Sequence, residues 1–342
     1  MCNFKSMVVC RERVLCSIKH DSHRKLLDEA KIRDDLDEPD FVKVELVPQD
    51  NDYANLDSYK FQIDQTYLPS WWNATWAESE CREILKRIMV KYPVEFPGEL
   101  MINTDVKLLK LESVGGHVEI RGKSKFELSN LKTVGGHVEI RGKSKFELSN
   151  LKTVGGYVNI GYNAKLTVPN LKTVGGYVSI GYNAKFTVPN LKTVSGFVNI
   201  GYNAKFEAPN LKTVGGFVEI HENAKFTAPN LKTVGGYVEI RDNAKFTASQ
   251  LKTVGGFVNI HENAKLTVPL LKTVGGYVVI WDNVKFEVPK LKTIGGYVVI
   301  WDNAKFTAPN LETVGEYVGV ENNVKFTAPN LKTVNGEPWT GR

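Results

Sequence analysis

The sequence predicts a mainly β protein, in which a right-handed β-solenoid of eleven 20-residue coils plus a partial twelfth follows a small α+β N-terminal domain. Two observations predict the solenoid. Copies of one unit begin at Leu111 and recur every 20 residues as far as Leu331, and the unit is rich in Val, Ile, Thr, Tyr and Phe, which favour strands. A third observation sets the boundary, because residues 1–105 contain no such repeat. We therefore expect a capping domain at 1–105, the solenoid at 106–334 and a C-terminal tail or cap at 335–342.

The N-terminal part is predicted to alternate strands and helices. Its expected strands lie in residues 7–18, 41–47 and 59–63, and a first helix is expected over residues 22–35. Thr75 and Glu78 have the spacing of a capping box, which predicts the start of a second helix. The apolar stripe of that helix is expected at Ile84, Leu85, Ile88 and Met89. The tryptophan-rich stretch PSWWNATW, residues 69–76, is expected to pack as core.

One unit, LKTVGGYVEIRDNAKFTASQ from Leu231, illustrates the expected coil, with Leu231 as unit position 1. Side chains alternate between the two faces of a strand, so the segment YVEIR should turn every second residue inward. The expected inward residues are Leu231, Val234, Val238, Ile240 and Phe246. The expected outward residues are Tyr237, Glu239 and Arg241. The paired glycines at positions 5 and 6 should permit a tight corner.

The pattern V-x-I-x-x-N, preceded by L-x-x-V and followed by an apolar residue, resembles the core of leucine-rich repeats. The whole tandem repeat, from Leu111 to about Val334, resembles the coils of receptor L domains still more closely. This resemblance implies that the asparagine at position 13 sits in a turn and bonds neighbouring backbone as a ladder. Lys123 and Lys143 replace it in the first two coils, which implies a looser turn there. The coil lacks a helical return segment, which favours a β-helix-like stack over a curved horseshoe.

The outward positions 7, 9 and 11 form columns along one face. Position 7 is aromatic in most coils, and rings stacked one strand apart stabilise each other without any ligand. Positions 9 and 11 vary between coils, as a recognition surface requires and as drift after duplication would also produce. Tryptophans beside valines and tyrosines are typical of a protein contact. The candidate partner-binding residues are Trp281, Trp301, Tyr277, Tyr297, Tyr237, Arg241, Tyr162, Tyr182 and Tyr202.

Lysine columns are the second candidate surface. Residues 1–110 carry 16 basic against 20 acidic residues, whereas residues 111–342 carry 28 against 18. Position 15 is lysine in every full coil, and like charges at strand spacing repel unless a polyanion such as nucleic acid offsets them. Alternatively, glutamates at position 17 neutralise part of the charge and the lysines keep the rod in solution. The candidate polyanion-binding residues are Lys165, Lys185, Lys205, Lys225 and Lys245.

Motifs for catalysis or cofactors are scarce. Cys10, Cys16, His20 and His23 could ligate zinc in principle, but their spacing fits no common zinc pattern, so we predict no metal site and no cofactor. Histidines and neighbouring glutamates of the repeats are expected to be exposed residues without a catalytic role. No P-loop, dinucleotide fingerprint or nucleophile elbow occurs, so the chain is not expected to be an enzyme.

The sequence thus predicts a non-enzymatic protein-binding or scaffold protein that recognises another protein through the outward strand face. Polyanion binding through the lysine columns is the alternative, and end-to-end self-association through the C-terminal end of the solenoid is a weaker one. All four cysteines lie in the first hundred residues, and no segment approaches eighteen apolar residues. Both features favour a cytoplasmic protein without a membrane partner.

Overall fold

The computed structural model describes residues 5–17, 20–34, 39–49, 56–89, 95–96, 98–102, 106–107, 111–121, 126–142 and 145–341. These residues form a mainly β fold with a β-solenoid of about 11 turns and two helices, which confirms the predicted fold class. Contacts divide the chain into two compact units, Met1–His137 and Val138–Arg342. The first unit combines a four-stranded sheet with the first coils, and the second consists of coils.

The four-stranded sheet of the first unit is antiparallel, with strand order β2-β1-β3-β4. Its strands are β1 (Lys5–Cys10), β2 (Arg13–Leu15), β3 (Phe41–Pro48) and β4 (Tyr59–Ile63), with a short 3-10 helix at Leu56–Ser58. These strands and helix α1 (His23–Ala30) lie where the apolar patterns predict them. Ser22 caps α1, because its hydroxyl accepts a hydrogen bond from the Lys25 backbone N–H.

Each face of this sheet has its own core, because alternate residues of a strand point to opposite sides. One cluster joins Val8 and Phe41 to Leu26 and Leu27 of α1. The other joins the opposite strand faces to α2 (Ala74–Met89), and Trp71, Trp72 and Trp76 pack against it half-buried. Of the predicted stripe of α2, Leu85 is buried, and its buried companions are Ala77 and Cys81 at a spacing of four residues.

The predicted capping box of α2 is wrong. The helix begins one residue before Thr75, and the Trp76 backbone N–H donates to the Asn73 side-chain oxygen over 3.0 Å. Asparagine is as good an N-cap as threonine, and here it directly precedes the first helical residue. Glu78, the other half of the predicted box, instead pairs with Arg82 one turn on, at 2.7 Å.

Coil-like strands begin before the first recognisable repeat. Within the first unit, β5 (Glu95–Phe96), β6 (Leu100–Ile102) and β7 (Val106–Lys107) pair in parallel with β8 (Ser113–Val114), β9 (Val118–Arg121) and β10 (Phe126–Glu127), and β8 pairs with β11 (Thr133–Val134). Leu100 lies beside Val118, and Ile102 beside Ile120. The Gly116 N–H donates to the Gly98 carbonyl over 3.0 Å. A divergent coil therefore precedes Leu111.

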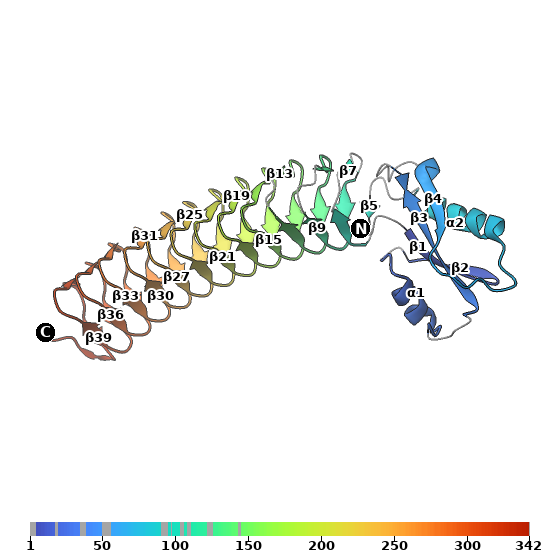
Figure 1. The fold of residues 1–342 in the computed structure, drawn as a ribbon. Helices are drawn as coiled ribbons and strands as arrows, with labels where there is room; N and C mark the ends of the chain where they lie inside the picture. The colour runs from blue at the N-terminus through green and yellow to red at the C-terminus, as the bar shows by residue number, and fades with distance from the viewer. Residues whose placement is uncertain are drawn as a thin grey trace. The chain divides into compact units, whose positions relative to one another are not determined.

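In the second unit each coil contributes three short strands, and equivalent strands pair in parallel at a register of 20 residues (Figure 1). The face that carries positions 8–10 is formed by β12 (Val138–Arg141), β15 (Val158–Ile160), β18 (Val178–Ile180), β21 (Val198–Ile200), β24 (Val218–Ile220), β27 (Val238–Ile240), β30 (Val258–Ile260), β33 (Val278–Ile280), β36 (Val298–Ile300) and β39 (Val318–Val320). We call this the V-x-I face.

Positions 15–17 form the second face, which we call the K-F-T face. Its strands are β13 (Lys145–Glu147), β16 (Lys165–Thr167), β19 (Lys185–Thr187), β22 (Lys205–Glu207), β25 (Lys225–Thr227), β28 (Lys245–Thr247) and β31 (Lys265–Thr267), followed in a separate sheet by β34 (Lys285–Glu287), β37 (Lys305–Thr307) and β40 (Lys325–Thr327). The third face holds two-residue strands from positions 3–4. These are β14 (Thr153–Val154), β17 (Thr173–Val174), β20 (Thr193–Val194), β23 (Thr213–Val214), β26 (Thr233–Val234), β29 (Thr253–Val254), β32 (Thr273–Val274), β35 (Thr293–Ile294), β38 (Thr313–Val314) and β41 (Thr333–Val334).

The predicted core columns are confirmed. In the coil that begins at Leu231, all five predicted inward side chains are fully buried. Two alanine columns, represented by Ala244 and Ala248, complete this core. Small side chains suit those positions because the coil turns there and leaves little interior space.

Position 13 is confirmed as a turn residue. Its asparagines have positive φ between 56° and 63° in the coils from Asn163 to Asn323, a conformation that only glycine, asparagine and aspartate adopt readily. The predicted ladder of their side chains to backbone is wrong. The position 13 side-chain bond seen in the described coils runs from Asn183 Nδ2 to Asn163 Oδ1 (3.3 Å). Lys123 and Lys143 lie outside the described residues.

A side-chain-to-backbone ladder does exist, at position 20. There the asparagine amide donates to the carbonyl of the proline one coil earlier, for example Asn230 Nδ2 to Pro209 O at 2.9 Å. The same bond occurs at Asn190, Asn210, Asn310 and Asn330. The ladder therefore closes the corner between the K-F-T face and the third face.

The glycine corner depends on close approach between coils rather than on an unusual φ. A Cβ added at Gly255 would lie 2.1 Å from the Gly235 carbonyl oxygen. The Gly256 N–H in turn donates to the Gly236 carbonyl over 2.9 Å. Glycine lets the two backbones meet at this corner.

At the C-terminal end, β42 (Glu337–Pro338) folds back and pairs antiparallel with β41. Asn335 and Gly336, both with positive φ, form the two-residue turn of this hairpin. The Trp339 N–H donates to the Lys332 carbonyl over 2.8 Å. The hairpin extends the third face only.

Candidate binding surface

The V-x-I face presents three outward columns beside each other. In β27 the side chains of Val238 and Ile240 are fully buried, whereas Tyr237, Glu239 and Arg241 are half-buried on the outer side. The same alternation occurs in the neighbouring strands, which pair in exact 20-residue register, as Glu219 with Glu239 and Glu239 with Asn259. Each outward side chain therefore has a known neighbour in the next coil.

The position 7 column is a continuous stack of rings. From Tyr157 to Tyr317, successive ring centroids lie 4.4–5.0 Å apart, with interplanar angles of 1–12°. Burial in this stack raises the pKa of Tyr237, Tyr277 and Tyr297 above the usual value, with a smaller contribution from nearby carboxylates and tyrosines. The stack supports the structural role of the rings, and their edges line the rest of the face.

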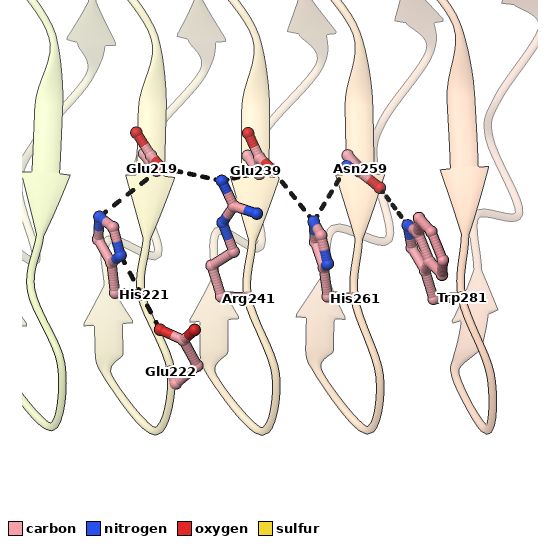
Figure 2. A network of polar contacts seen from close by, with 8 residues as sticks. All are labelled: Glu219, His221, Glu222, Glu239, Arg241, Asn259, His261 and Trp281. Atoms are coloured by element: carbon pink, nitrogen blue, oxygen red, sulfur yellow. Dashed lines mark hydrogen bonds and ion pairs between the residues drawn. The ribbon is translucent and has the colours of Figure 1, made fainter.

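Positions 9 and 11 form a diagonal polar network across five coils (Figure 2). Arg241 Nη2 lies 3.4 Å from Glu219 of the preceding coil and 3.1 Å from Glu239 of its own coil. His261 Nε2 lies 3.1 Å from Glu239 and 3.1 Å from the Asn259 amide. Each position 11 side chain thus bonds position 9 of its own coil and of the coil before, which holds both columns in place.

The network ends on the two tryptophans. Trp281 Nε1 donates to Asn259 Oδ1 over 2.9 Å, and the indole stacks on His261 at 5.5 Å. Trp301 stacks on Trp281 at 5.2 Å. Despite these contacts both tryptophans remain 36–37% exposed, which is unusual for such large apolar side chains. The face therefore carries a fixed, partly exposed aromatic pair.

The structure brings six of the predicted partner-binding residues together on the V-x-I face. These are Tyr237, Arg241, Tyr277, Trp281, Tyr297 and Trp301. Tyr162, Tyr182 and Tyr202 instead lie in the turns that follow the strands, with 47–56% of each side chain exposed. Tyr202 is close to the network, because its ring lies 5.2 Å from that of His221.

The expectation that the repeat histidines are exposed is wrong. The side chains of His221 and His261 are only 24% and 18% exposed and lie 3.6 Å and 3.1 Å from Glu219 and Glu239. Sequence reasoning missed them because their partners are two residues or 22 residues away. A signal was present: position 9 of one coil and position 11 of the next are complementary as Glu with Arg, Glu with His, and Asn with Trp.

The K-F-T face places the position 15 lysines in register, as Lys205 beside Lys225 and Lys225 beside Lys245. Lys185 lies 3.3 Å from Glu207. Among the described residues, the other four predicted polyanion-binding lysines have no carboxylate within ion-pair distance. The positive charge of this face is thus only partly neutralised.

The cysteine and histidine set of the N-terminal sheet does not converge. Among the described residues, neither cysteine belongs to a cluster of potential metal ligands. Burial raises the pKa of Cys16 to about 11 and that of Cys81 to about 12, which suppresses the thiolate that metal binding needs. His20 instead pairs with Glu29 at 3.0 Å. His23 has other partners, the Val44 carbonyl and Asp64.

Comparisons with protein-family models, with curated proteins and with solved structures give no match. Within the described ranges, no helix has the length and apolar character needed to span a membrane. What the V-x-I face offers chemically is a flat surface with ring edges, two indoles and a chain of fixed donors and acceptors.

Proposed function

We propose that the protein is a non-enzymatic binding protein that recognises a partner protein through the V-x-I face. The observation that carries this proposal is the exposed pair Trp281 and Trp301, held by stacking and by the bond to Asn259. Large aromatic side chains dominate binding energy at protein interfaces. Side chains that are already fixed lose little entropy when a partner binds, which raises the affinity.

The test is binding by the full chain with both tryptophans replaced. The double variant Trp281→Ala with Trp301→Ala should lose its partner in a pull-down, with affinity reduced by at least about thirtyfold, as expected for interface hot spots. The matched control, Thr247→Ala with Thr267→Ala, changes two outward residues of the K-F-T face and should keep the partner. Circular dichroism should be unchanged in both. Equal recovery of the partner by the two double variants would refute the proposal.

We also propose that the coils are related to leucine-rich repeats and receptor L domains, and that the protein acts as a scaffold in the cytoplasm. The V-x-I strand followed by an asparagine of positive φ supports the kinship. The absence of any helix from the described coils of the second unit separates them from long leucine-rich repeats.

A second candidate function is binding of nucleic acid or another polyanion along the K-F-T face. It is supported by the in-register lysines that lack carboxylate partners, since a polyanion would relieve their repulsion. Binding to single-stranded DNA, measured by fluorescence anisotropy, should weaken steeply with salt. The variant Lys205→Gln with Lys225→Gln should reduce the slope of that salt dependence by about two phosphate contacts. No retention on heparin at low salt would exclude this function.

End-to-end self-association remains a weaker proposal. It is supported by the half-exposed inner residues of the last coil, such as Val320, which is 46% exposed in β39. Sedimentation velocity over a wide concentration range tests it. A strict monomer at high concentration would exclude it.

A further inference from the structure

Three potential metal ligands converge in the N-terminal sheet, away from the surface proposed above. His23 is the first residue of α1, Glu45 lies in β3 and Asp64 directly follows β4. One ligand atom from each of the three lies within 4.8 Å of the other two. Residues 20 or more positions apart in the chain are thus brought to one point by the sheet.

The imidazole of His23 is held in the orientation of a metal ligand. Its Nε2 lies 2.9 Å from the Val44 carbonyl oxygen, which can only accept, so Nε2 carries the proton. Its Nδ1 lies 3.2 Å from Asp64 Oδ2. In metal sites the ligating histidine commonly donates its other N–H to a backbone carbonyl, which directs the free lone pair at the ion. The Val44 bond therefore directs Nδ1 towards the two carboxylates.

These carboxylates lack a Lys or Arg partner. Among the described residues, no lysine or arginine lies within ion-pair distance of Glu45 or Asp64. Lys43, on the same strand face as Glu45, is instead paired with Asp34 at 2.7 Å. Burial, and secondarily the charge of Asp64, raises the pKa of Glu45, as expected for a carboxylate that lacks a nearby cation other than His23.

The backbone around the cluster is well fixed. Val44 pairs with Ile63, and Glu45 with Gln62, in the β3–β4 ladder. The Asp64 N–H donates to the Lys43 carbonyl over 2.8 Å, which continues this ladder past the end of β4. Ligands on paired strands hold their spacing better than ligands on loops.

We propose that His23, Glu45 and Asp64 bind a divalent transition-metal ion, with Zn²⁺ as the best-matched ion. One imidazole and two carboxylates are ligands that zinc accepts, and three protein ligands leave a position for water or for a group from a partner. Bonds of about 2.1 Å place tetrahedral ligands about 3.4 Å apart. Rotation of the carboxylates, of which Asp64 is 56% exposed, can bring the present spacing to that value.

The test is isothermal titration of the full chain with Zn²⁺ and, separately, with Mg²⁺. The wild type should bind one Zn²⁺ that the single variants His23→Gln, Glu45→Gln and Asp64→Asn each lose, with affinity lowered at least tenfold to a hundredfold. Mg²⁺ should not compete, because it avoids imidazole. Circular dichroism of the three variants should match the wild type.

Two controls separate this site from other histidines. His20→Gln removes the histidine that pairs with Glu29 near the same helix, and His261→Gln removes one from the V-x-I face. Both should retain the Zn²⁺ event with unchanged affinity. Should a variant of the cluster unfold, thermal denaturation of the wild type with and without Zn²⁺ provides a second measurement, with a rise in Tm expected. No Zn²⁺ event in the wild type, or one that survives in Asp64→Asn and His23→Gln, would overturn the proposal.

Discussion

The V-x-I and K-F-T faces of the same coil use one backbone plan and reach opposite electrostatic results. Both consist of short parallel strands in 20-residue register, with the middle or flanking apolar residues fully buried. On the V-x-I face, outward residues differ from coil to coil, and Arg241 lies between two glutamates. On the K-F-T face the outward lysine repeats, so Lys225 lies between two lysines.

The difference shows what repetition costs a solenoid. Register places each outward side chain beside its counterpart, so identical charged letters repel and only a change of letter can create a complementary pair. Apolar inner residues have no such conflict, because identical side chains pack well against one another. Variation on the V-x-I face therefore has a structural benefit of its own, in addition to any role in recognition.

The largest expected effect is inside the coil, where the two faces should be equivalent. Phe226 is fully buried and stacks between Phe206 and Phe246 at 4.9 Å and 4.8 Å. Phe226→Ala should lower the free energy of unfolding by about 3–5 kcal/mol, and Ile220→Ala on the V-x-I side by about 2–5 kcal/mol. Urea unfolding followed by circular dichroism measures both. A loss below about 1 kcal/mol at either site would contradict the packing described for that face.

Charge reversal should act with opposite signs on the two faces. Arg241→Glu places a third carboxylate between Glu219 and Glu239 and should lower the free energy of unfolding by about 1–2 kcal/mol. Lys225→Glu places a carboxylate between two lysines and should raise it by about 0.5 kcal/mol. Thermal and urea unfolding give both values.

High salt is the control for these charge reversals, since both changes should shrink in about 1 M NaCl. The same sign for Arg241→Glu and Lys225→Glu at low salt would break the comparison between the faces.

The turn that joins the two faces gives a sharper but smaller effect. Asn243 has φ of 59° between β27 and β28. Asn243→Ala should lower the free energy of unfolding by about 1 kcal/mol, because alanine is strained in the left-handed region. Asn243→Gly should stay within about 0.5 kcal/mol of the wild type. If the two variants are equally stable in a melting experiment, the turn does not depend on φ.

The smallest effect concerns alkaline pH and the ring stack of the V-x-I face. Tyr237, Tyr277 and Tyr297 have a pKa raised above the usual 10.0, mainly by burial. Below about pH 10 these phenols are neutral in both the folded and the unfolded chain, so they add no pH dependence. Above it the unfolded chain releases protons first, and stability should fall as pH rises.

Absorbance of phenolate during a pH titration should show late ionisation in the folded protein, and Tyr277→Phe should reduce the loss of stability between about pH 9 and pH 11. An unchanged slope in Tyr277→Phe would exclude a contribution from this ring.

Much of the fold could be predicted because stacking leaves little choice for inner residues such as Val238 and Ile240. The coil before Leu111 was missed because Gly98, Leu100 and Ile102 keep the spacing of the repeat but not its letters. The start of α2 was misplaced because Asn73 and Thr75 are both good caps, and only the backbone decides between them. Local letters therefore predict the element better than its ends.

The candidate surface was predicted only in part. Alternation along a strand tells which side Arg241 and Trp281 occupy, but it does not tell which side chains in neighbouring coils they meet. The bonds of Arg241 to Glu219 and of Trp281 to Asn259 each span 22 residues and require the sideways offset of one coil against the next. That offset is a property of the folded stack, and no single unit contains it.

The backbone bonds between coils have a consequence for how such a gene changes. The Lys232 N–H donates to the Lys212 carbonyl as Lys252 donates to Lys232, so every coil offers the next an identical seat. Recombination that deletes or adds a whole unit leaves this pattern intact, and the array behaves like a line of movable type. What such shuffling breaks is the pairing of adjacent letters, as between Asn259 and Trp281, so the order of the coils carries information that their number does not.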